Sequence, residues 1–345
     1  MTVAQTDHLQ PPRDPGVQTA ALRVRGLSVS FHNRRGPIPA VRDVNLDVAR
    51  GELLALLGES GSGKSATARA IMGLHAGSSA EVSAESMEVA GTDLLTCSPE
   101  QLRKLRGSTM SLIFQDALSA LNPVLSIGDQ IGELYRQHQG ASKKQARLKA
   151  GEMLSLVGIP GAMSRIDDYP HQFSGGMRQR LLIAMAIALE PELLIADEPT
   201  TALDVTVQAQ ILELLDRLRR ELDMGVLLIT HDLGVVCEVA DKVAVMYAGR
   251  IVETASADAL FNQPAHPYTE ALLTSVPQAG RIGSELPVIP GSPPVPSALP
   301  SGCAFHPRCA WALDECHVTR PELVSVAADR AAACLRTEEV IRVER

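Results

Sequence analysis

The sequence lacks any long apolar run, which excludes several classes of protein. The longest candidate, residues 181–200, is interrupted by Glu190, Pro191 and Glu192, so no membrane-spanning helix is predicted. The N-terminal residues have no apolar centre of the kind that a secretory signal needs, and we expect residues 1–20 to form a disordered tail. The chain is therefore expected to stay in the cytoplasm.

The sequence also lacks an excess of basic residues. It has 32 Lys and Arg against 40 Asp and Glu, a formal net charge of −8. This balance argues against a general nucleic-acid binder, because phosphate contacts need a concentrated basic surface. Aromatic residues are few, at 3%, but this deficit alone excludes no class of protein. The length allows two domains, or one large domain with an extension.

Cysteine is scarce, yet its distribution is uneven. Of the six cysteines, Cys97 and Cys237 are isolated and are expected to be structural. The other four lie near the end of the chain, at Cys303, Cys309, Cys316 and Cys334. In the reducing cytoplasm that the sequence predicts, structural disulfides are disfavoured, so metal ligation and plain buried thiols stay open.

Apolar patterning predicts an α/β fold. The alternating text of residues 22–48 is typical of two or three antiparallel strands. Short continuous apolar runs predict strands buried on both faces of a parallel sheet, and helix-like text separates them. These runs are LLALLG at 53–58, LLIAD at 193–197, VLLIT at 226–230 and KVAVMY at 242–247.

Two regions depart from this alternation. Residues 116–170 contain helical segments and no convincing strand, which predicts a helical insertion into the α/β core. Between residues 277 and 300 the chain has seven prolines, which predict an extended, irregular segment. After the tail, we therefore expect a main domain at 21–262 and a small proline-rich, cysteine-bearing extension at 263–345.

A glycine-rich turn follows the first predicted buried strand and matches G-x-x-x-x-G-K-[ST]. Glycines let backbone N–H groups surround phosphate oxygens, and the following helix N-terminus adds a favourable dipole. Lys64 is expected to reach the outer phosphates and Ser65 to ligate Mg²⁺. A chance glycine-rich turn is the alternative, which the strand and helix context disfavours. The predicted nucleotide ligands are Gly58, Glu59, Ser60, Gly61, Ser62, Gly63, Lys64, Ser65 and Ala66.

Polar side chains follow three of the predicted strands. Ligands of open α/β sheets lie at the carboxyl ends of strands, so Asp197 is expected to hold Mg²⁺ and Glu198 to polarise an attacking water as general base. Taken alone, this pair also fits an acidic junction that caps the next helix. His231 is predicted to hydrogen-bond the γ-phosphate, and Gln115 to serve as a further Mg²⁺ ligand.

A second potential anion site lies in FSGGMRQR, residues 173–180. Ser174, Gly175 and Gly176 open a predicted helix there, and a helix N-terminus attracts anions. One nucleotide does not need two such sites in one subunit, whereas two chains arranged head to tail do. We therefore expect each ATP to lie between the glycine-rich turn of one chain and these three residues of another.

Taken in order, these motifs resemble those of the nucleotide-binding subunit of an ATP-binding cassette (ABC) transporter. GESGSGKS resembles the Walker A motif, FSGGM the signature motif and LLIADE the Walker B motif, while Gln115, TALD at 201–204 and His231 resemble the Q-loop, D-loop and switch histidine. The resemblance implies an ABC-type P-loop NTPase with a RecA-like core, an antiparallel β subdomain and a helical subdomain. Phe31 falls where the family places an aromatic that stacks on adenine; a core phenylalanine is the alternative.

A finer resemblance is to the peptide and nickel importer branch of this family. FQDALSALNPVLSIGDQI, FSGGMRQR and AHPYTEALLTSVP are similar to the ATPases of oligopeptide and dipeptide permeases. The signature reads FSGGM where the broad family has LSGGQ. The resemblance implies an ATPase that powers import of di- or oligopeptides; importers of nickel or other small solutes, ABC ATPases acting on nucleic acid or ribosomes, and phosphate-loop kinases are the alternatives.

The resemblance also implies partners and a location. Two integral membrane permease subunits would form the channel, with the ATPase peripheral at the cytoplasmic face of the membrane. A second, related ATPase subunit is expected, because heterodimers are favoured over homodimers in this branch. An extracytoplasmic solute-binding protein would act indirectly, and no nucleic acid is expected as a partner.

The same branch bears on the four clustered cysteines. Their separations of five, six and seventeen intervening residues do not include the short gap of a zinc knuckle. Members of the branch can carry a [4Fe–4S] cluster in this region, so a cluster on Cys303, Cys309, Cys316 and Cys334 is the preferred prediction. Zinc, with His306 or His317 as substitute ligands, and unligated thiols stay open. The cluster is expected to staple the extension rather than to perform redox chemistry.

Overall fold

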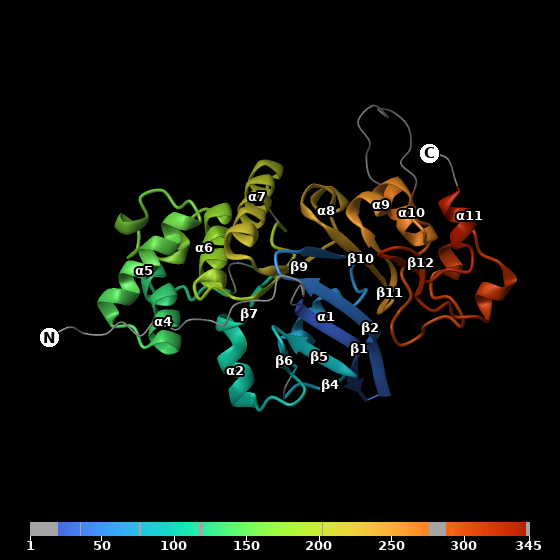
Figure 1. Ribbon diagram of the computed structural model, residues 1–345, viewed down its shortest axis with the longest axis horizontal. Helices are drawn as coiled ribbons and strands as arrows, with labels where there is room; N and C mark the ends of the chain where they lie inside the picture. The colour runs from blue at the N-terminus through green and yellow to red at the C-terminus, as the bar shows by residue number, and fades with distance from the viewer. Residues whose placement is uncertain are drawn as a thin grey trace.

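The computed structural model places two sheets at the centre of the molecule, a group of helices at one end and the C-terminal region at the other (Figure 1). No helix in the described ranges is long and apolar enough to cross a membrane. The predicted tail falls almost entirely outside these ranges, so its conformation stays a prediction. The structure describes residues 20–34, 36–75, 77–116, 120–201, 203–275 and 288–342.

The first sheet is antiparallel and has five strands. Its longest strands, β1 (Ala20–Asn33) and β2 (Gly36–Ala49), pair along most of their length and confirm the strands predicted over 22–48. Alternate apolar residues of β1 and β2 are buried in a shared core, as the period-two pattern requires. The other strands are β4 (Ala80–Ser83), β5 (Ser86–Val89) and β6 (Thr92–Asp93).

The second sheet has eight strands in the order β12-β13-β11-β10-β3-β9-β8-β7. The neighbouring strands β10, β3, β9, β8 and β7 run parallel. Strands β3, β8 and β9 are buried at every residue, which confirms the continuous apolar runs as strands. Their carboxyl ends therefore meet at one edge of the sheet. The bounds are β3 (Leu53–Leu57), β7 (Met110–Ile113), β8 (Leu193–Asp197), β9 (Gly225–Thr230), β10 (Lys242–Tyr247) and β11 (Arg250–Ser256).

Helices pack on this sheet and form the separate group at one end. The described part of 116–170 contains helices and no strand, which agrees with the predicted helical insertion. Ser126 and Ser142 cap α4 and α5 there by accepting backbone N–H groups. The helices are α1 (Lys64–Ile71), α2 (Pro99–Ser108), α4 (Ile127–Gln139), α5 (Lys143–Leu156), α6 (Gly175–Ile187), α7 (Val205–Leu222) and α8 (Leu233–Val239), with short 3₁₀ turns at Ala162–Ser164 and Pro170–Gln172.

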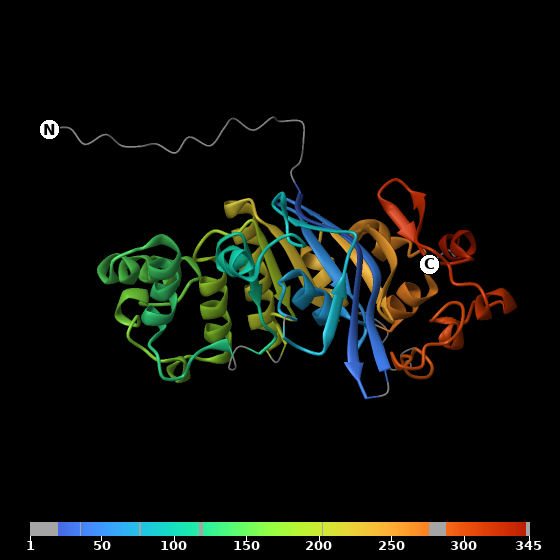
Figure 2. The ribbon, with the colours of Figure 1, turned by 90° about the horizontal axis from the view of Figure 1, so that it is seen from below.

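The C-terminal extension is integrated with the sheet, which the sequence did not predict. Strand β13 pairs antiparallel with β11, and Figure 2 shows the extension in orange and red against the end of the molecule far from the green helices. Residues 288–300 contain no helix or strand, in agreement with the irregular segment predicted there. Helix α9 (Ala257–Asn262) ends the predicted main domain. The elements of the extension are α10 (Pro267–Thr274), β12 (Val324–Ala327), β13 (Arg330–Ala332) and α11 (Thr337–Ile341), with 3₁₀ turns at His306–Arg308 and Asp314–His317.

Candidate functional site

The glycine-rich turn links the end of β3 to the start of α1 and depends on its glycines. Gly61 and Gly63 have φ angles of +79° and +111°, in the left-handed region that side chains disfavour. A Cβ on Gly63 would lie 2.5 Å from the carbonyl oxygen of Ala40, and one on Gly58 would lie 2.2 Å from that of Met246. The backbone thus forms a tight loop that only glycine at these positions permits.

Lys64 lies inside this loop. Its side chain is almost fully buried, and Nζ donates hydrogen bonds to the carbonyl oxygens of Gly58 at 2.6 Å and Glu59 at 3.0 Å. Burial lowers the pKa of Lys64, and the carboxylates of Glu198, Asp197 and Glu59 oppose that shift. A cation is therefore held in the loop beside the carboxylates that end β8.

Ser65 and Asp197 meet at the same edge of the sheet. The Ser65 hydroxyl donates to Oδ1 of Asp197 at 3.0 Å. Burial raises the pKa of Asp197, with the hydrogen bond from Ser65 acting against it and the charge of Glu198 adding to it. A hydroxyl and a carboxylate are hard oxygen donors of the kind that Mg²⁺ prefers. The buried hydroxyl of Ser62 has no hydrogen-bond partner among the described residues, so a polar group of the loop is left for a ligand.

Glu198 is the point on which the other predicted groups converge. Its carboxylate accepts hydrogen bonds from Gln115 Nε2 at 2.6 Å and from Thr201 Oγ1 at 2.9 Å, and it lies 3.1 Å from His231 Nδ1. Partial burial raises the pKa of Glu198, but the bonds from Thr201 and His231 and the charge of Lys64 outweigh burial and leave it below its usual range. The side chain is therefore an anion near neutral pH, as a general base must be.

The structure places Gln115 and His231 as predicted, at the carboxyl ends of β7 and β9. In the present state Gln115 bonds Glu198, so its predicted contact with Mg²⁺ stays a prediction. Sequence reasoning assigned Thr201 only to the D-loop; its contact with Glu198 was missed, because a hydroxyl three residues after a carboxylate carries no distinctive signal.

The three residues of the signature motif lie at the start of α6. Ser174 caps this helix, since its Oγ accepts the N–H of Met177. A Cβ on Gly176 would lie 2.5 Å from Cγ1 of Val207 in α7, so the absence of a side chain there lets the two helices approach. The predicted contact of Ser174, Gly175 and Gly176 with a nucleotide on another chain is not tested by a single chain.

Phe31 lies in β1 and packs at the margin of the core. Its ring meets that of His75 edge to face, with centroids 5.4 Å apart. Stacking on adenine therefore stays a prediction for this side chain.

The clustered cysteines lie in one neighbourhood of the extension. Burial raises the pKa of Cys303, and it raises the pKa of Cys309 to about 11 and that of Cys334 to about 12. The neighbouring thiols add to these shifts. Within the described ranges, however, no group of three or more His, Cys, Asp or Glu side chains is arranged to hold a metal ion. The geometry therefore does not support the predicted cluster, and it does not support zinc.

The structure also bears on the two histidines near the cluster and on the two isolated cysteines. The rings of His306 and His317 lie 4.2 Å apart, but they are not part of a metal-holding group among the described residues. Cys97 is partly buried, whereas Cys237 is exposed and so is not a packed structural residue.

The α/β core, with a phosphate loop facing two strand-end carboxylates, defines the chain as a phosphate-loop NTPase. The added antiparallel sheet and helical insertion narrow the class to ATP-binding cassettes. Residues 41–201 match the family model described as ABC transporter, and residues 252–316 match a second model, the C-terminal region of oligopeptide/dipeptide transporters.

Curated relatives extend the match over nearly the whole chain. The chain is 48% identical to the oligopeptide transport ATP-binding protein AppD of Bacillus subtilis, over 92% of this chain and 97% of that protein. It is 51% identical to a putative peptide import ATP-binding protein of Brucella abortus, over 93% and 97%. The chain belongs to the family of ABC transporter ATP-binding proteins and is an ATPase of that family.

Solved structures agree with this assignment. The ATP-binding cassette MJ0796, in a dimeric post-hydrolysis state bound to ADP and Pi, superposes with a TM-score of 0.61 at 26% identity, covering 68% of this chain and 98% of that one. CbiO1 of Clostridium perfringens, part of the ABC transporter complex cbiONQ, gives a TM-score of 0.60 at 26% identity over 70% and 91%. The part of this chain beyond the cassette is thus an addition to a shared core.

Proposed function

We propose that this ABC ATPase powers the import of di- or oligopeptides through a membrane permease. The observation that carries the proposal is the match of residues 252–316 to the C-terminal region of oligopeptide/dipeptide transporters, together with relatives named for peptide import. Nickel or another small solute is the second candidate, because the ATPase subunit itself need not touch the transported solute.

Within the site, the phosphate loop and Lys64 would hold the phosphates of ATP. Ser65 and Asp197 would ligate Mg²⁺, with Gln115 as a further ligand once it leaves Glu198. This assignment is supported by the 3.0 Å contact between the Ser65 hydroxyl and Asp197 and by the unsatisfied hydroxyl of Ser62 in the loop. Bound Mg²⁺ supplies charge neutralisation at the phosphates.

For hydrolysis, Glu198 would accept a proton from the attacking water while His231 stabilises charge at the γ-phosphate. The contact of 3.1 Å between His231 Nδ1 and Glu198 Oε1 supports this, since it orients both groups. Before the Glu198 carboxylate can bind this water, it must lose the hydrogen bond that it accepts from Gln115. Gln115 follows β7 and leads into the helical insertion, so the exchange would transmit the state of the site to that region.

We infer that the working unit contains two cassettes. In that unit, the start of α6, with Ser174, Gly175 and Gly176, would face the ATP that is held by the phosphate loop of a second, related ATPase subunit. The structure of MJ0796 is dimeric, which supports such a pairing. Two permease subunits would place the pair at the cytoplasmic face of the membrane, and a solute-binding protein would deliver the peptide from the other side.

We also propose that the four cysteines of the extension bind an iron–sulfur cluster, for which their side chains would have to move closer together than they are in this structure. Burial raises the pKa of Cys309 and Cys334, and backbone N–H groups of Trp311 and Arg336 offset part of that shift by donating to the two sulfurs at 3.4 and 3.3 Å. Such donors stabilise thiolate, the form that binds iron. Anaerobic purification followed by iron and labile-sulfide assays tests it. Colourless protein that contains neither would reject the cluster.

Transport is tested by purifying the chain with its membrane subunits and reconstituting the complex in vesicles. We expect ATP-dependent uptake of labelled peptide, and no uptake when Glu198→Gln replaces the native subunit. Uptake of Ni²⁺ without peptide would move the assignment to the second candidate. Recovery of the chain with ribosomes or nucleic acid and without membrane subunits would contradict transport altogether.

A further inference from the structure

An ion pair, buried on its Arg308 side, joins the C-terminal extension to the phosphate loop. The guanidinium of Arg308 donates from Nη1 and Nη2 to the two carboxylate oxygens of Glu59, at 2.7 and 3.0 Å. The Arg308 side chain is 5% exposed and that of Glu59 is 26% exposed. Paired, charge-assisted hydrogen bonds of this kind are strong and geometrically specific. Glu59 is the second residue of the glycine-rich turn, so the extension reaches the nucleotide site directly.

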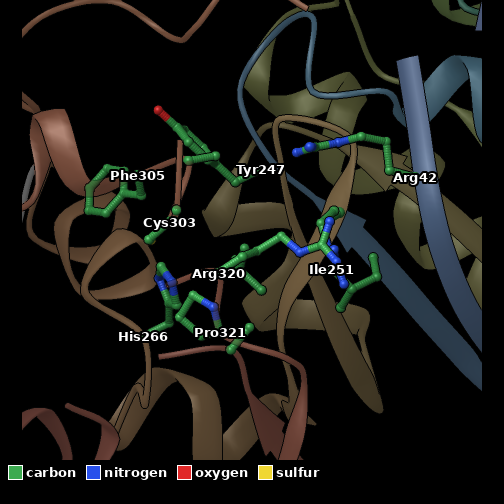
Figure 3. A pocket seen from close by; sticks show the side chains of 13 residues that line it. Arg42, Tyr247, Ile251, His266, Cys303, Phe305, Arg320 and Pro321 are labelled. Atoms are coloured by element: carbon green, nitrogen blue, oxygen red, sulfur yellow. The ribbon is translucent and has the colours of Figure 1, made fainter. Parts of the chain in front are cut away.

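The environment fixes Arg308 in this position. Its Nε donates to the carbonyl oxygen of Pro290 at 2.9 Å, and Nη1 lies 3.4 Å from the hydroxyl of Tyr247. The rings of Tyr247, Tyr268 and Phe305 pack together beneath it, with centroids 4.6 to 5.3 Å apart. Figure 3 shows Tyr247 of β10 beside Phe305 and Cys303 of the extension.

Glu59 is held at its backbone as well as at its carboxylate. Its N–H donates to the hydroxyl of Tyr268 at 2.9 Å, and its carbonyl oxygen accepts from Lys64 Nζ at 3.0 Å. Tyr268 lies in α10, so two segments of the extension contact one residue of the loop. The same residue contacts the lysine that is to bind phosphate.

Glu59 is predicted to bind nucleotide through the backbone of the loop, whereas the charge of its carboxylate is unfavourable for ATP binding. A carboxylate in this turn repels the phosphates, and the repulsion is strong where the loop is shielded from water. Arg308 neutralises that charge with a side chain that cannot lose its proton. An arginine in the extension therefore compensates for an acid in the phosphate loop.

We propose that Arg308 is a positioning residue for ATP binding, which neutralises Glu59 and fixes the start of the phosphate loop from the C-terminal extension. The proposal rests on the assignment of the phosphate loop to ATP and is independent of the transported solute. It assigns the extension a role in nucleotide affinity.

The test is steady-state hydrolysis by the full-length chain in five forms: native, Arg308→Ala, Glu59→Gln, Arg308→Ala with Glu59→Gln, and Arg320→Ala as the matched control. Arg320 belongs to the same extension and pairs with Glu322. We expect Arg308→Ala to raise KM for ATP about tenfold, as loss of a charge-assisted pair implies, with kcat within about twofold because Glu198 and His231 are untouched. The control should match the native chain.

The double variant separates this role from a merely structural one. If the unpaired carboxylate is what weakens binding, Glu59→Gln should return KM close to the native value in the Arg308→Ala background. A double variant as impaired as the single one would overturn the proposal, and so would an unchanged KM in Arg308→Ala.

Folding is checked in the same samples. The single tryptophan of the chain, Trp311, lies three residues after Arg308 and donates to Glu270 at 3.0 Å, so its emission reports on the extension. If Arg308→Ala changes the Trp311 emission, the KM for ATP of the Glu59→Gln single variant tests the proposal instead. Its amide oxygen still accepts from Arg308, and KM at or below the native value supports the proposal, whereas a tenfold rise would overturn it.

Discussion

At the scale of single residues, neighbouring carboxylates in this protein have pKa values shifted in opposite directions. Asp197 is buried, which raises its pKa, whereas Glu198 receives hydrogen bonds from Thr201 and His231 that lower its pKa. Asp197 ends the buried strand β8, and the backbone leaves strand geometry at Glu198, which has a φ angle of +49°. The change of backbone conformation between them thus separates the proposed metal ligand from the proposed base.

Glu198→Gln tests the base assignment. The amide cannot accept the proton of the attacking water, so we expect turnover to fall by about two to four orders of magnitude, while ATP still binds because Lys64 and the loop are unchanged. Steady-state hydrolysis and a nucleotide-binding titration measure the two effects. The exposed Glu213→Gln on α7 is the control, and near-native turnover in Glu198→Gln would refute the role.

Thr201→Val tests the hydrogen bond that lowers the pKa of Glu198. Valine keeps the shape of threonine but cannot donate, so the pKa of Glu198 should rise towards its ordinary value. The acid limb of the kcat–pH profile should therefore move to higher pH by up to about one unit. Thr201→Ser retains a hydroxyl and should keep the native profile. An unmoved acid limb in Thr201→Val would show that this bond does not control the titration.

At the scale of elements, helix α10 depends on a neutral histidine. His266 is 1% exposed, its Nδ1 accepts the N–H of Tyr268, and its ring bonds the backbone of Ala333. Burial lowers the pKa of His266 to about 3, against the hydrogen bond to Ala333. A protonated ring would lose its acceptor nitrogen and with it the cap of α10.

This arrangement predicts a pH-dependent stability. Between about pH 6.5 and pH 3 the unfolded chain binds a proton at His266 that the folded chain does not, so the free energy of unfolding should fall by about 1.4 kcal/mol per pH unit as the pH is lowered. Above that window the histidine is neutral in both states. Urea unfolding at several pH values should show a shallower decline for His266→Asn, which keeps a helix-capping group; an identical slope would contradict the cited pKa shift.

At the scale of the whole molecule, the extension shares its core with the cassette. Phe305 and Tyr268 of the extension pack with Tyr247, Val243 and Val245 of β10 in one buried cluster, and β13 continues the main sheet through β11. The described part of the extension therefore shares its buried cluster with β10, and we expect it to unfold together with the cassette.

Phe305→Ala tests this coupling. The ring is 2% exposed, so its removal should lower the free energy of unfolding by about 3 to 5 kcal/mol within a single transition seen by both circular dichroism and Trp311 emission. Val318→Ala, at 78% exposed in the same extension, should change it by less than about 0.5 kcal/mol. Two separated transitions in the native chain would show that the extension is an independent unit.

The amino-acid sequence by itself determined the elements and most of the site. The buried strands, the helical insertion and the phosphate loop follow from local patterns: continuous apolar runs, helical periodicity, and glycines where a Cβ would collide with backbone. Local patterns placed the predicted groups at strand ends and helix starts: Lys64 and Ser65 open a helix, Asp197 ends a buried strand, and Glu198 and His231 directly follow one.

Tertiary structure alone decided how distant segments meet. Strand β13 has three residues, too few for a pattern, and it exists because β11 offers an open edge to pair with. Arg308 and Glu59 are 249 residues apart, and no spacing rule relates them. The extension reaches the phosphate loop only because the chain folds back along β10 and β11, where burying aromatic rings stabilises the contact.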